Sequence, residues 1–376
     1  MNKAKLVPII LFFTLSFGAG AVTSFSRKKY FSENQNRYLA QFPELTPKKY
    51  FSGDYTDKLE EYISDHFLMR EQLTQFKTNT DIAIGKKDIN GIYITKDRLI
   101  EKIDEPNESV TQRSIDYINN FAQFFEKPVF FMLVPTQAEI YKDELPANAP
   151  NQDQRKYIDN VYERLEKINM IDVYGTLSSS SNEYIYYRTD HHWTTKGAYY
   201  AYLTASKKMD FEAHTEDYYD HSHNSNDFRG SFYSKTLYNG VRPDTIDIWL
   251  HKENGISEEP EIYVYSDING EPVKHDGIYF KEYLEKKDKY SVFFGTNQPL
   301  IKIKTFHEGG RLLIIKDSYA HCFVPFLADH YSEITMIDTR YVQSPLNDLA
   351  DPDKYDQALL LYNVSTFMDG ITLRIS

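Results

Sequence analysis

The chain has 376 residues and a net charge of −12, with 43 Lys and Arg against 55 Asp and Glu. This acidic balance argues against a nucleic-acid-binding protein, which needs a basic surface to neutralise phosphates. The content of 41% hydrophobic and 26% charged residues is typical of a globular protein. Cys322 is the one cysteine, so an intramolecular disulfide is excluded.

The N-terminus has the pattern of an export segment. Lys3 and Lys5 precede an uncharged run over residues 6–26, which is long enough to span a bilayer as a helix. The small residues 19–21 offer a cleavage point for a signal peptidase. We therefore expect residues 1–26 to be a signal peptide or an N-terminal membrane anchor, followed by a polar linker over residues 27–50. Both readings make the protein extracytoplasmic, either secreted or in contact with the membrane through its N-terminus alone.

From residue 51 to 376 the pattern predicts one α/β domain. Apolar residues at helical spacing predict helices over residues 51–78, 110–125, 154–168 and 195–209, and one that begins near residue 319. Short apolar runs predict strands at 90–94, 129–135, 170–173, 311–316, 333–338 and 357–362. This alternation indicates a mostly parallel central sheet covered by helices on both faces. Residues 211–305 break the alternation, and we interpret them as an inserted irregular, β-rich stretch.

Two segments carry residues suited to nucleophilic catalysis. The first places Asp190, His191 and His192 on a loop just before a helix. Two residues apart in an extended segment, Asp190 and His192 project from the same side, so that the carboxylate can orient the imidazole as a general base. The same geometry points His191 the other way.

The second segment is the run Lys316-Asp317-Ser318-Tyr319-Ala320 at the end of a predicted strand. A serine at a strand-to-helix turn is exposed at the carboxyl end of a sheet, where its own N–H and the helix N-terminus are available to an oxyanion. Taken alone, Asp-Ser is an ordinary turn. Together with the first segment it completes the three roles of a Ser–His–Asp triad.

The tetrapeptide Asp190-His191-His192-Trp193 resembles the motif of the DHHW family. The order of the two segments is similar to that in the SGNH hydrolase-like domains of the alginate O-acetylation proteins, and the resemblance extends through residues 33–43, 62–67 and 337–341. It implies a flavodoxin-like α/β sandwich with Ser318 as acyl nucleophile, His192 as general base and Asp190 as its orienting acid. For the oxyanion hole or substrate contacts the weaker candidates are Arg340, Tyr319, Asn363, Asn297 and Trp193.

The resemblance implies an O-acetyltransferase that acts on a cell-surface or secreted polysaccharide, without a cofactor. A carbohydrate acetylesterase shares the same acyl-enzyme, and a non-catalytic glycan-binding or scaffold protein could keep the same fold, so both alternatives stay open. A membrane-bound O-acyltransferase is the implied protein partner. We expect the pocket beside Ser318 to be an open, aromatic-lined groove that includes Tyr319 and Trp193.

No metal site is expected from the sequence. His191 and His192 are adjacent, but their side chains should diverge, and no further ligand cluster completes a site. The histidines at 214, 221 and 223 lie in an acidic, Tyr-rich stretch that predicts a solvated loop. Cys322, four residues after Ser318, is expected to pack in the core.

Overall fold

The structure is a computed structural model that describes residues 6–7, 29–251, 259–342 and 344–374. It divides into two compact units: Met1–Asn90 with Tyr233–Gly240, and Gly91–Phe232 with Val241–Ser376. Apart from residues 6–7, the predicted export segment lies outside the described residues. Within the described ranges, every helix is too short or too polar to cross a membrane.

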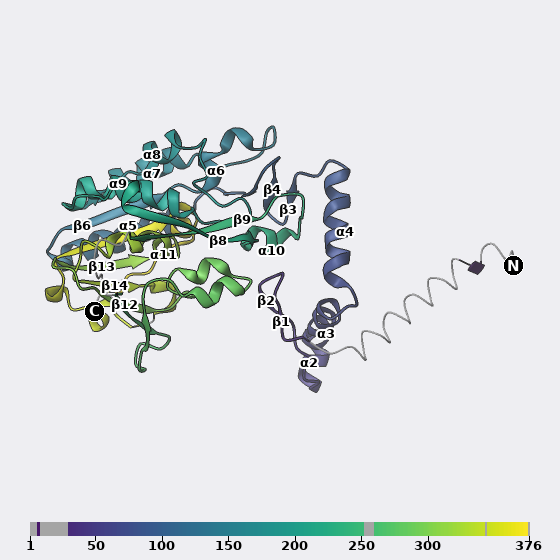
Figure 1. The fold of residues 1–376 in the computed structure, drawn as a ribbon. Helices are drawn as coiled ribbons and strands as arrows, with labels where there is room; N and C mark the ends of the chain where they lie inside the picture. Colours follow the sequence, from purple (N-terminus) through teal and green to yellow (C-terminus); the bar gives the residue numbers. More distant parts are fainter. Residues whose placement is uncertain (1–5, 8–28, 252–258, 343, 375–376) are drawn as a thin grey trace. The chain divides into compact units, whose positions relative to one another are not determined.

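An eight-stranded sheet forms the centre of the larger unit (Figure 1). In order across the sheet, its strands are β11 (Val273–Asp276), β10 (Glu261–Tyr265), β12 (Leu300–Lys304), β14 (Glu333–Ile337), β13 (Arg311–Lys316), β15 (Gln357–Asn363), β6 (Val129–Val134) and β7 (Asn169–Met170). The five strands from β14 to β7 run parallel to one another, whereas β12, β10 and β11 add antiparallel pairings at one edge. The protein therefore has a mixed α/β fold with a large, mostly parallel sheet.

β13, β15 and β6, the three inner strands of the parallel part, carry apolar side chains on both faces, and each face is buried in a hydrophobic cluster. Alternate residues of these strands enter two separate hydrophobic clusters. One cluster includes residues of α9 (Thr195–Met209), α11 (Tyr319–Phe323) and the 3-10 helix η5 (Val324–Leu327). The other includes residues of α5 (Glu108–Phe125), α7 (Gln154–Glu163) and α13 (Val364–Asp369). Continuous apolar runs are the expected pattern for strands buried in this way.

Parallel register brings the carboxyl ends of these strands to one edge. Lys316 of β13 pairs with Leu361 of β15, and Asn363 of β15 pairs with Val134 of β6. The residues that follow each strand therefore gather at the same place, which is where ligands bind in open α/β sheets. Ser318 is among them, two residues beyond the end of β13.

The predicted insertion at residues 211–305 is more ordered than a set of loops. β8 (Tyr219–Phe228) and β9 (Asp244–His251) form a separate antiparallel pair. β10, β11 and β12 instead extend the central sheet. Sequence reasoning separated these strands from the sheet because they are short and carry many polar residues, as suits an edge with one solvated face.

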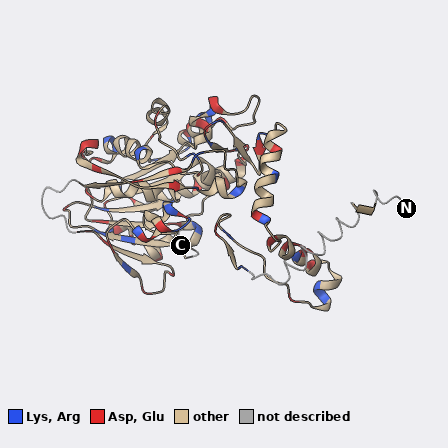
Figure 2. Ribbon diagram, turned by 45° about the vertical axis from the view of Figure 1, so that its right-hand side comes forward, with Lys and Arg blue, Asp and Glu red and all other residues tan. Residues whose placement is uncertain are grey.

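Shorter elements complete the larger unit. They are β4 (Ile92–Ile94), β5 (Leu99–Glu101), α6 (Gln137–Ile140), η1 (Lys142–Glu144), α8 (Tyr174–Ser179), η2 (Glu216–Tyr218), η3 (Lys281–Glu285), η4 (Lys289–Val292), η6 (Thr339–Tyr341), α12 (Leu346–Leu349) and η7 (Pro352–Lys354). α10 spans Ser231–Thr236, and β3 spans Asp88–Ile89. Acidic and basic residues are interspersed over the helices and strands (Figure 2).

The smaller unit contains β1 (Phe31–Ser32), β2 (Arg37–Tyr38), α2 (Pro47–Phe51), α3 (Asp54–Asp65) and α4 (Arg70–Ala83). The prediction of a single helix over residues 51–78 is wrong. The helix is interrupted between α3 and α4, where the backbone of Met69 is left-handed with a φ of 56°. Left-handed backbone is rare for a residue other than glycine, so no sequence signal marks this break.

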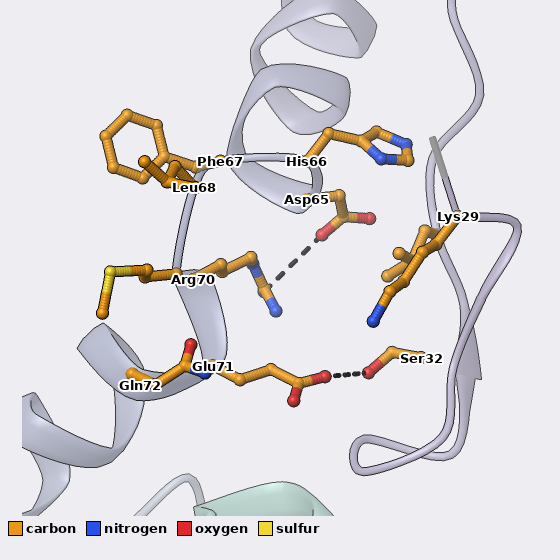
Figure 3. Close-up of a pocket in the computed structure, with 11 residues that line it drawn as sticks. Lys29, Ser32, Asp65, His66, Phe67, Leu68, Arg70, Glu71 and Gln72 are labelled. Atoms are coloured by element: carbon orange, nitrogen blue, oxygen red, sulfur yellow. Dashed lines mark hydrogen bonds and ion pairs between the residues drawn. The ribbon is translucent and has the colours of Figure 1, made fainter. Parts of the chain in front are cut away.

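The polar stretch predicted as a linker makes specific contacts within this unit. Arg37 forms an ion pair with the carboxylate of Asp65, and the Ser32 hydroxyl donates to Glu71 at 2.8 Å. Figure 3 shows these acidic side chains around a pocket of about 300 Å³. The charged and polar residues of this stretch thus bind side chains of α3 and α4. Their composition resembles that of a solvated linker, because composition does not show these contacts.

Candidate active site

Ser318 lies at the carboxyl edge of the sheet, between β13 and α11. Its φ of −69° and ψ of −15° are ordinary helical values, so the turn carries none of the strain of a left-handed nucleophile elbow. The side chain is close to fully enclosed, since the residue is 7% exposed. Among the described residues, no acceptor lies within hydrogen-bonding geometry of its backbone N–H. That N–H is therefore available to an incoming oxygen.

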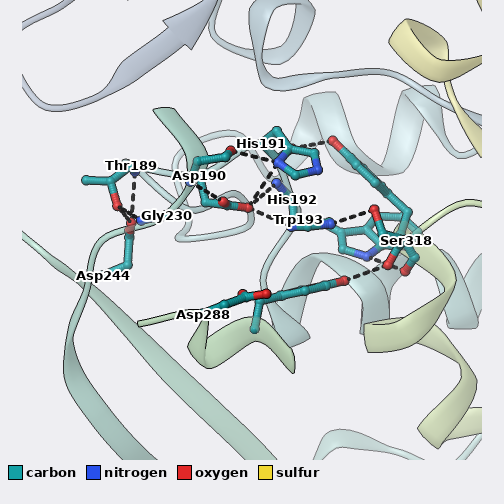
Figure 4. Close-up of polar contacts among 12 residues, drawn as sticks. Thr189, Asp190, His191, His192, Trp193, Gly230, Asp244, Asp288 and Ser318 are labelled. Atoms are coloured by element: carbon teal, nitrogen blue, oxygen red, sulfur yellow. Dashed lines mark hydrogen bonds and ion pairs between the residues drawn. The ribbon is translucent and has the colours of Figure 1, made fainter. Parts of the chain in front are cut away.

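The Asp190–His192 loop lies against Ser318 (Figure 4). His192 Nε2 is 2.8 Å from Ser318 Oγ, and His192 Nδ1 is 2.6 Å from Asp190 Oδ1. The Tyr186–Trp193 bridge and the start of α9, which Thr194 caps, fix the two ends of the loop. The three residues proposed for the triad are thus joined in one hydrogen-bonded relay, at the distances expected of a nucleophile, its base and an orienting acid.

Burial and the neighbouring charges set the protonation of this relay. Burial lowers the pKa of His192 to about 4, with a further contribution from His191, so the imidazole is neutral at pH 7. Burial raises the pKa of the Asp190 carboxyl, but the two histidines outweigh it and hold this pKa well below the ordinary value. A carboxylate beside a neutral imidazole is the resting state that a general base requires.

His191 does not point away from the relay, contrary to the sequence expectation. Its ring lies 3.7 Å from the His192 ring, centroid to centroid, and its Nδ1 is 2.9 Å from Ser231 Oγ. The expectation assumed an extended segment, whereas residues 188–192 are bent. The two histidine side chains therefore do not diverge.

Asp190, His191 and His192 each offer one donor atom within a mutual distance of 4.8 Å, as a metal site would need. Both ring nitrogens of His192 already contact Ser318 and Asp190. The second Asp190 oxygen, Oδ2, accepts from the backbone N–H of Ser231 at 2.7 Å. These donors are arranged for proton transfer among themselves.

Two of the weaker oxyanion candidates are occupied by Asp317. The Asp317 carboxylate accepts from the backbone N–H of Tyr319 at 2.8 Å and from the backbone N–H of Asn363 at 2.8 Å. The side-chain amide of Asn363 donates to Asp317 and to Thr366 Oγ1. These N–H groups therefore already have acceptors in this structure, and the oxyanion or substrate role of Tyr319 and Asn363 stays a prediction. The hydrogen bonds between Asp317 and Asn363 connect the end of β13 to the end of β15.

Arg340 and Asn297 occupy different surroundings. Arg340 donates through Nε and Nη2 to the two oxygens of Asp338, a carboxylate that also contacts the buried amine of Lys316. Its side chain is 36% exposed, and the arginine contributes to lowering the pKa of His192. Asn297 lies in the turn after Phe294, with its side-chain oxygen buried and unpaired among the described residues.

Trp193 is a packing residue and lines no groove. It is 0% exposed, its Nε1–H donates to the carbonyl oxygen of Tyr319 at 3.1 Å, and its ring contacts Tyr319 and Phe323. It therefore supports the backbone on which Ser318 sits. With its side chain fully buried, Trp193 is not part of the aromatic groove lining that was expected.

A small pocket of about 50 Å³ lies beside the relay. It is lined by Glu101, Thr136, Gln137, His191, Phe232, Tyr319, Asn363, Ser365 and Thr366. Of the two residues expected in an aromatic groove, Tyr319 lines this pocket and Trp193 does not. Cys322 is fully buried, as expected of a core residue.

Gly230 and Asp244 contact the loop that carries Asp190, and sequence reasoning missed both. A Cβ at Gly230 would lie 2.2 Å from Asp190 Oδ2, so this position admits only glycine while Asp190 stays in place. The buried Asp244 carboxylate accepts from the backbone N–H groups of Arg188 and Thr189 at 2.6 and 2.8 Å. Both residues lie in the predicted insertion, 40 or more positions from Asp190, and no local motif marks them.

Tyr290 contacts two members of the relay. Its ring stacks on His192 with centroids 3.6 Å apart and planes 8° from parallel, and its hydroxyl donates to the carbonyl oxygen of Ser318 at 3.0 Å. It is buried and belongs to η4, within the predicted insertion. One tyrosine among 31 carries no sequence signal for this role.

Fold and site together define a mixed α/β protein with a Ser–His–Asp relay at the carboxyl edge of its sheet. The family model described as "DHHW protein" matches residues 77–337, and the chain belongs to this family. The membership predicted from residues 190–193 is therefore confirmed.

Solved structures share this fold. A DHHW family protein from Eubacterium siraeum is 25% identical with a TM-score of 0.66, over 77% of this chain and 97% of that one. PatB1 of Bacillus cereus is 19% identical with a TM-score of 0.60, over 74% and 96%, and its structure with a sulfonyl adduct gives 18% and 0.58, over 72% and 93%. The O-acetyltransferase domain of Pseudomonas putida AlgJ is a more distant match, 13% identical with a TM-score of 0.45 over 74% and 92%, which is too low to establish a shared fold. A search of curated proteins found no match.

Proposed function

We propose that this protein is a serine acyl-transfer enzyme of the SGNH hydrolase-like class, with Ser318 as nucleophile, His192 as general base and Asp190 as the acid that orients it. One observation carries the proposal: His192 lies between Ser318 Oγ at 2.8 Å and Asp190 Oδ1 at 2.6 Å, with its imidazole neutral at pH 7. This arrangement serves both proton transfer from the hydroxyl and stabilisation of the imidazolium that results.

In the first half-reaction, Ser318 Oγ attacks the carbonyl carbon of an acyl ester as its proton moves to His192 Nε2. The tetrahedral intermediate collapses, the bond from the carbonyl carbon to the leaving oxygen breaks, and His192 returns the proton to that oxygen. In the second, an acceptor hydroxyl attacks the acyl-serine and gives its proton to His192. Collapse then breaks the bond to Oγ, which recovers the proton from His192. Atoms and charges balance in both halves.

The negative oxygen of each intermediate needs hydrogen-bond donors. The backbone N–H of Ser318 is one, because it points from the turn before α11 and has no acceptor among the described residues. Removal of a single such donor costs about 10²–10³-fold in rate in well-studied enzymes. Arg340 is the candidate for a second donor, since its side chain is 36% exposed and its Nε and Nη2 donate to Asp338, which leaves Nη1 for the oxyanion.

The substrate proposed is an O-acetyl ester of a polysaccharide or wall polymer outside the membrane. The resemblance of residues 190–193 and 316–320 to the alginate O-acetylation proteins favours this class, and the apolar N-terminal segment favours export, with either a signal peptide or an anchor. A membrane-bound O-acyltransferase is the proposed source of acetyl groups. Transfer to a sugar hydroxyl is the leading reaction, and hydrolysis differs from it only in having water as the acceptor.

The test is turnover of a chromogenic acetyl ester with and without an oligosaccharide acceptor, followed by mass spectrometry of the oligosaccharide. A transferase acetylates the acceptor in a Ser318-dependent way. An esterase releases acetate, leaves the acceptor unmodified and deacetylates an acetylated one. No turnover by folded wild-type protein would leave the glycan-binding alternative.

A further inference from the structure

Asp329, two residues after the end of η5, is a buried carboxylate without a hydrogen-bond partner among the described residues. Its side chain is 2% exposed, yet neither oxygen makes a hydrogen bond among the described residues. A buried carboxylate in this condition costs several kcal/mol, which is why such groups are normally paired or bound to a metal. Asp329 is also among the residues that line a pocket of about 220 Å³, together with His251 and His307.

Three histidines from separate segments surround this carboxylate. His251 Nε2 lies 3.1 Å from Asp329 Oδ2, His214 Nε2 lies 3.7 Å from the same oxygen, and His307 Nε2 lies 3.4 Å from Oδ1. Each histidine is within reach of the carboxylate, but none is aligned to donate to it. Ligands of one metal ion have this geometry, because their donor atoms point at the ion and not at one another.

We propose that Asp329, His214, His251 and His307 form a binding site for a divalent transition-metal ion, with Zn²⁺ the best match. With Zn–N and Zn–O bonds of about 2.0–2.2 Å, neighbouring ligand atoms of a tetrahedral site lie about 3.3–3.5 Å apart. The distances from Oδ2 to His251 and His214, 3.1 and 3.7 Å, lie on either side of this range, while His307 lies 3.4 Å from the other oxygen, Oδ1. Imidazole with one carboxylate suits zinc and its neighbours, whereas Ca²⁺ and Mg²⁺ take mainly oxygen ligands.

The histidines must move closer together to bind the ion. Asp190, His191 and His192 are the one group of three in the described chain whose donor atoms all lie within 4.8 Å of one another, so the histidines around Asp329 are more widely spaced. Their side chains are 32% (His214), 29% (His251) and 43% (His307) exposed and have room to rotate. His221 and His223 lie on β8 rather than in the predicted loop, although His223 is exposed as expected, and His214 is one of the ligands proposed here.

The site joins the far ends of the two segments that carry the relay. α9 begins three residues after His192 and ends at Met209, five residues before His214. α11 and η5 begin just after Ser318 and end at Leu327, two residues before Asp329. α9 also packs against α11. A metal at Asp329 would therefore hold these two segments together at the end opposite the active site, as a structural rather than a catalytic ion.

The test uses the full chain, stripped with a chelator and titrated with Co²⁺ and Zn²⁺. We expect one Co²⁺ per chain with the visible absorption of tetrahedral nitrogen and oxygen ligation, displacement by Zn²⁺, and a higher Tm with metal. His251→Ala and Asp329→Asn should weaken binding by at least about 100-fold and remove the metal-dependent rise in Tm. Asp329→Asn keeps the shape of the side chain, so its Tm without metal should match or exceed that of the wild type.

Two control variants locate the binding. His223→Ala removes a surface histidine on β8 that is 76% exposed, and His191→Ala disrupts the other group of potential ligands. Both should bind Co²⁺ as the wild type does. The proposal is overturned if the wild type takes up no metal, or if His191→Ala abolishes binding while His251→Ala and Asp329→Asn retain it.

Discussion

Gly230→Ala tests whether the position of Asp190 controls the chemistry. The added Cβ would lie 2.2 Å from Asp190 Oδ2 and 2.3 Å from Asp190 Cβ, whereas ordinary contact begins at 3.4 Å. The carboxylate or the loop must therefore shift by about 1 Å. The backbone at Gly230 is not left-handed, so the effect comes from this contact alone.

A displacement of about 1 Å near reacting groups costs about 10²-fold in rate. We expect kcat for a chromogenic acetyl ester to fall by about that factor, because His192 loses the hydrogen bond that sets its tautomer. The overpacking should cost about 1–3 kcal/mol of folding stability, well short of unfolding the protein. Steady-state kinetics and thermal melts of the same preparation separate the two effects.

Gly175→Ala is the matched control. It lies in α8, its φ is not left-handed, and nothing lies within 4 Å of its added Cβ, so activity should be unchanged and stability equal or higher. If Gly230→Ala folds and keeps kcat within threefold of the wild type, Asp190 does not need the position seen here and the reasoning fails.

Three further predictions concern the relay. His192→Ala should lose about 10²–10⁴-fold in kcat, whereas His191→Ala should stay within about tenfold; equal losses in the same ester assay would refute the division of roles. Because burial lowers the pKa of His192 to about 4, kcat/KM should be constant through neutral pH and fall only as the pH drops through about 4, when His192 becomes protonated. A pH profile of kcat/KM with its acidic midpoint at or above 6.5 would contradict this. Tyr290→Phe removes a hydrogen bond of about 1 kcal/mol to Ser318 and should lower kcat about fivefold. Tyr290→Leu also removes the ring stacked on His192 and should lower kcat about 30-fold. An unchanged kcat in the leucine variant would show that Tyr290 does not position His192.

The sequence predicts well those parts of the fold that local patterns determine. β6, β13, β14 and β15 are found within a residue or so of their expected ranges, because strands buried on both faces are continuous apolar runs. α9 begins at its predicted cap, since the Thr194 side chain accepts from the N–H of Gly197. The relay follows from two short motifs at the ends of such elements.

Contacts distant in sequence are what the sequence does not reveal. Gly230, Asp244 and Tyr290 reach the site from the insertion, and their roles depend on where β9 and the loops before β12 lie. The orientation of His191 depends on a bend that no glycine or proline marks. The burial of Trp193 depends on the position of α11, and the sequence pattern admits both a stacking role and a packing role.

The central claim is that Ser318 becomes acylated, and the most direct measurement is mass spectrometry of the enzyme after rapid quenching during ester turnover. The wild type should gain one acetyl group, and peptide mapping should locate it on Ser318. Ser318→Ala should gain none, and His192→Ala should gain it far more slowly. Turnover by the wild type with the acetyl group on another residue, or undiminished turnover by Ser318→Ala, would contradict the account.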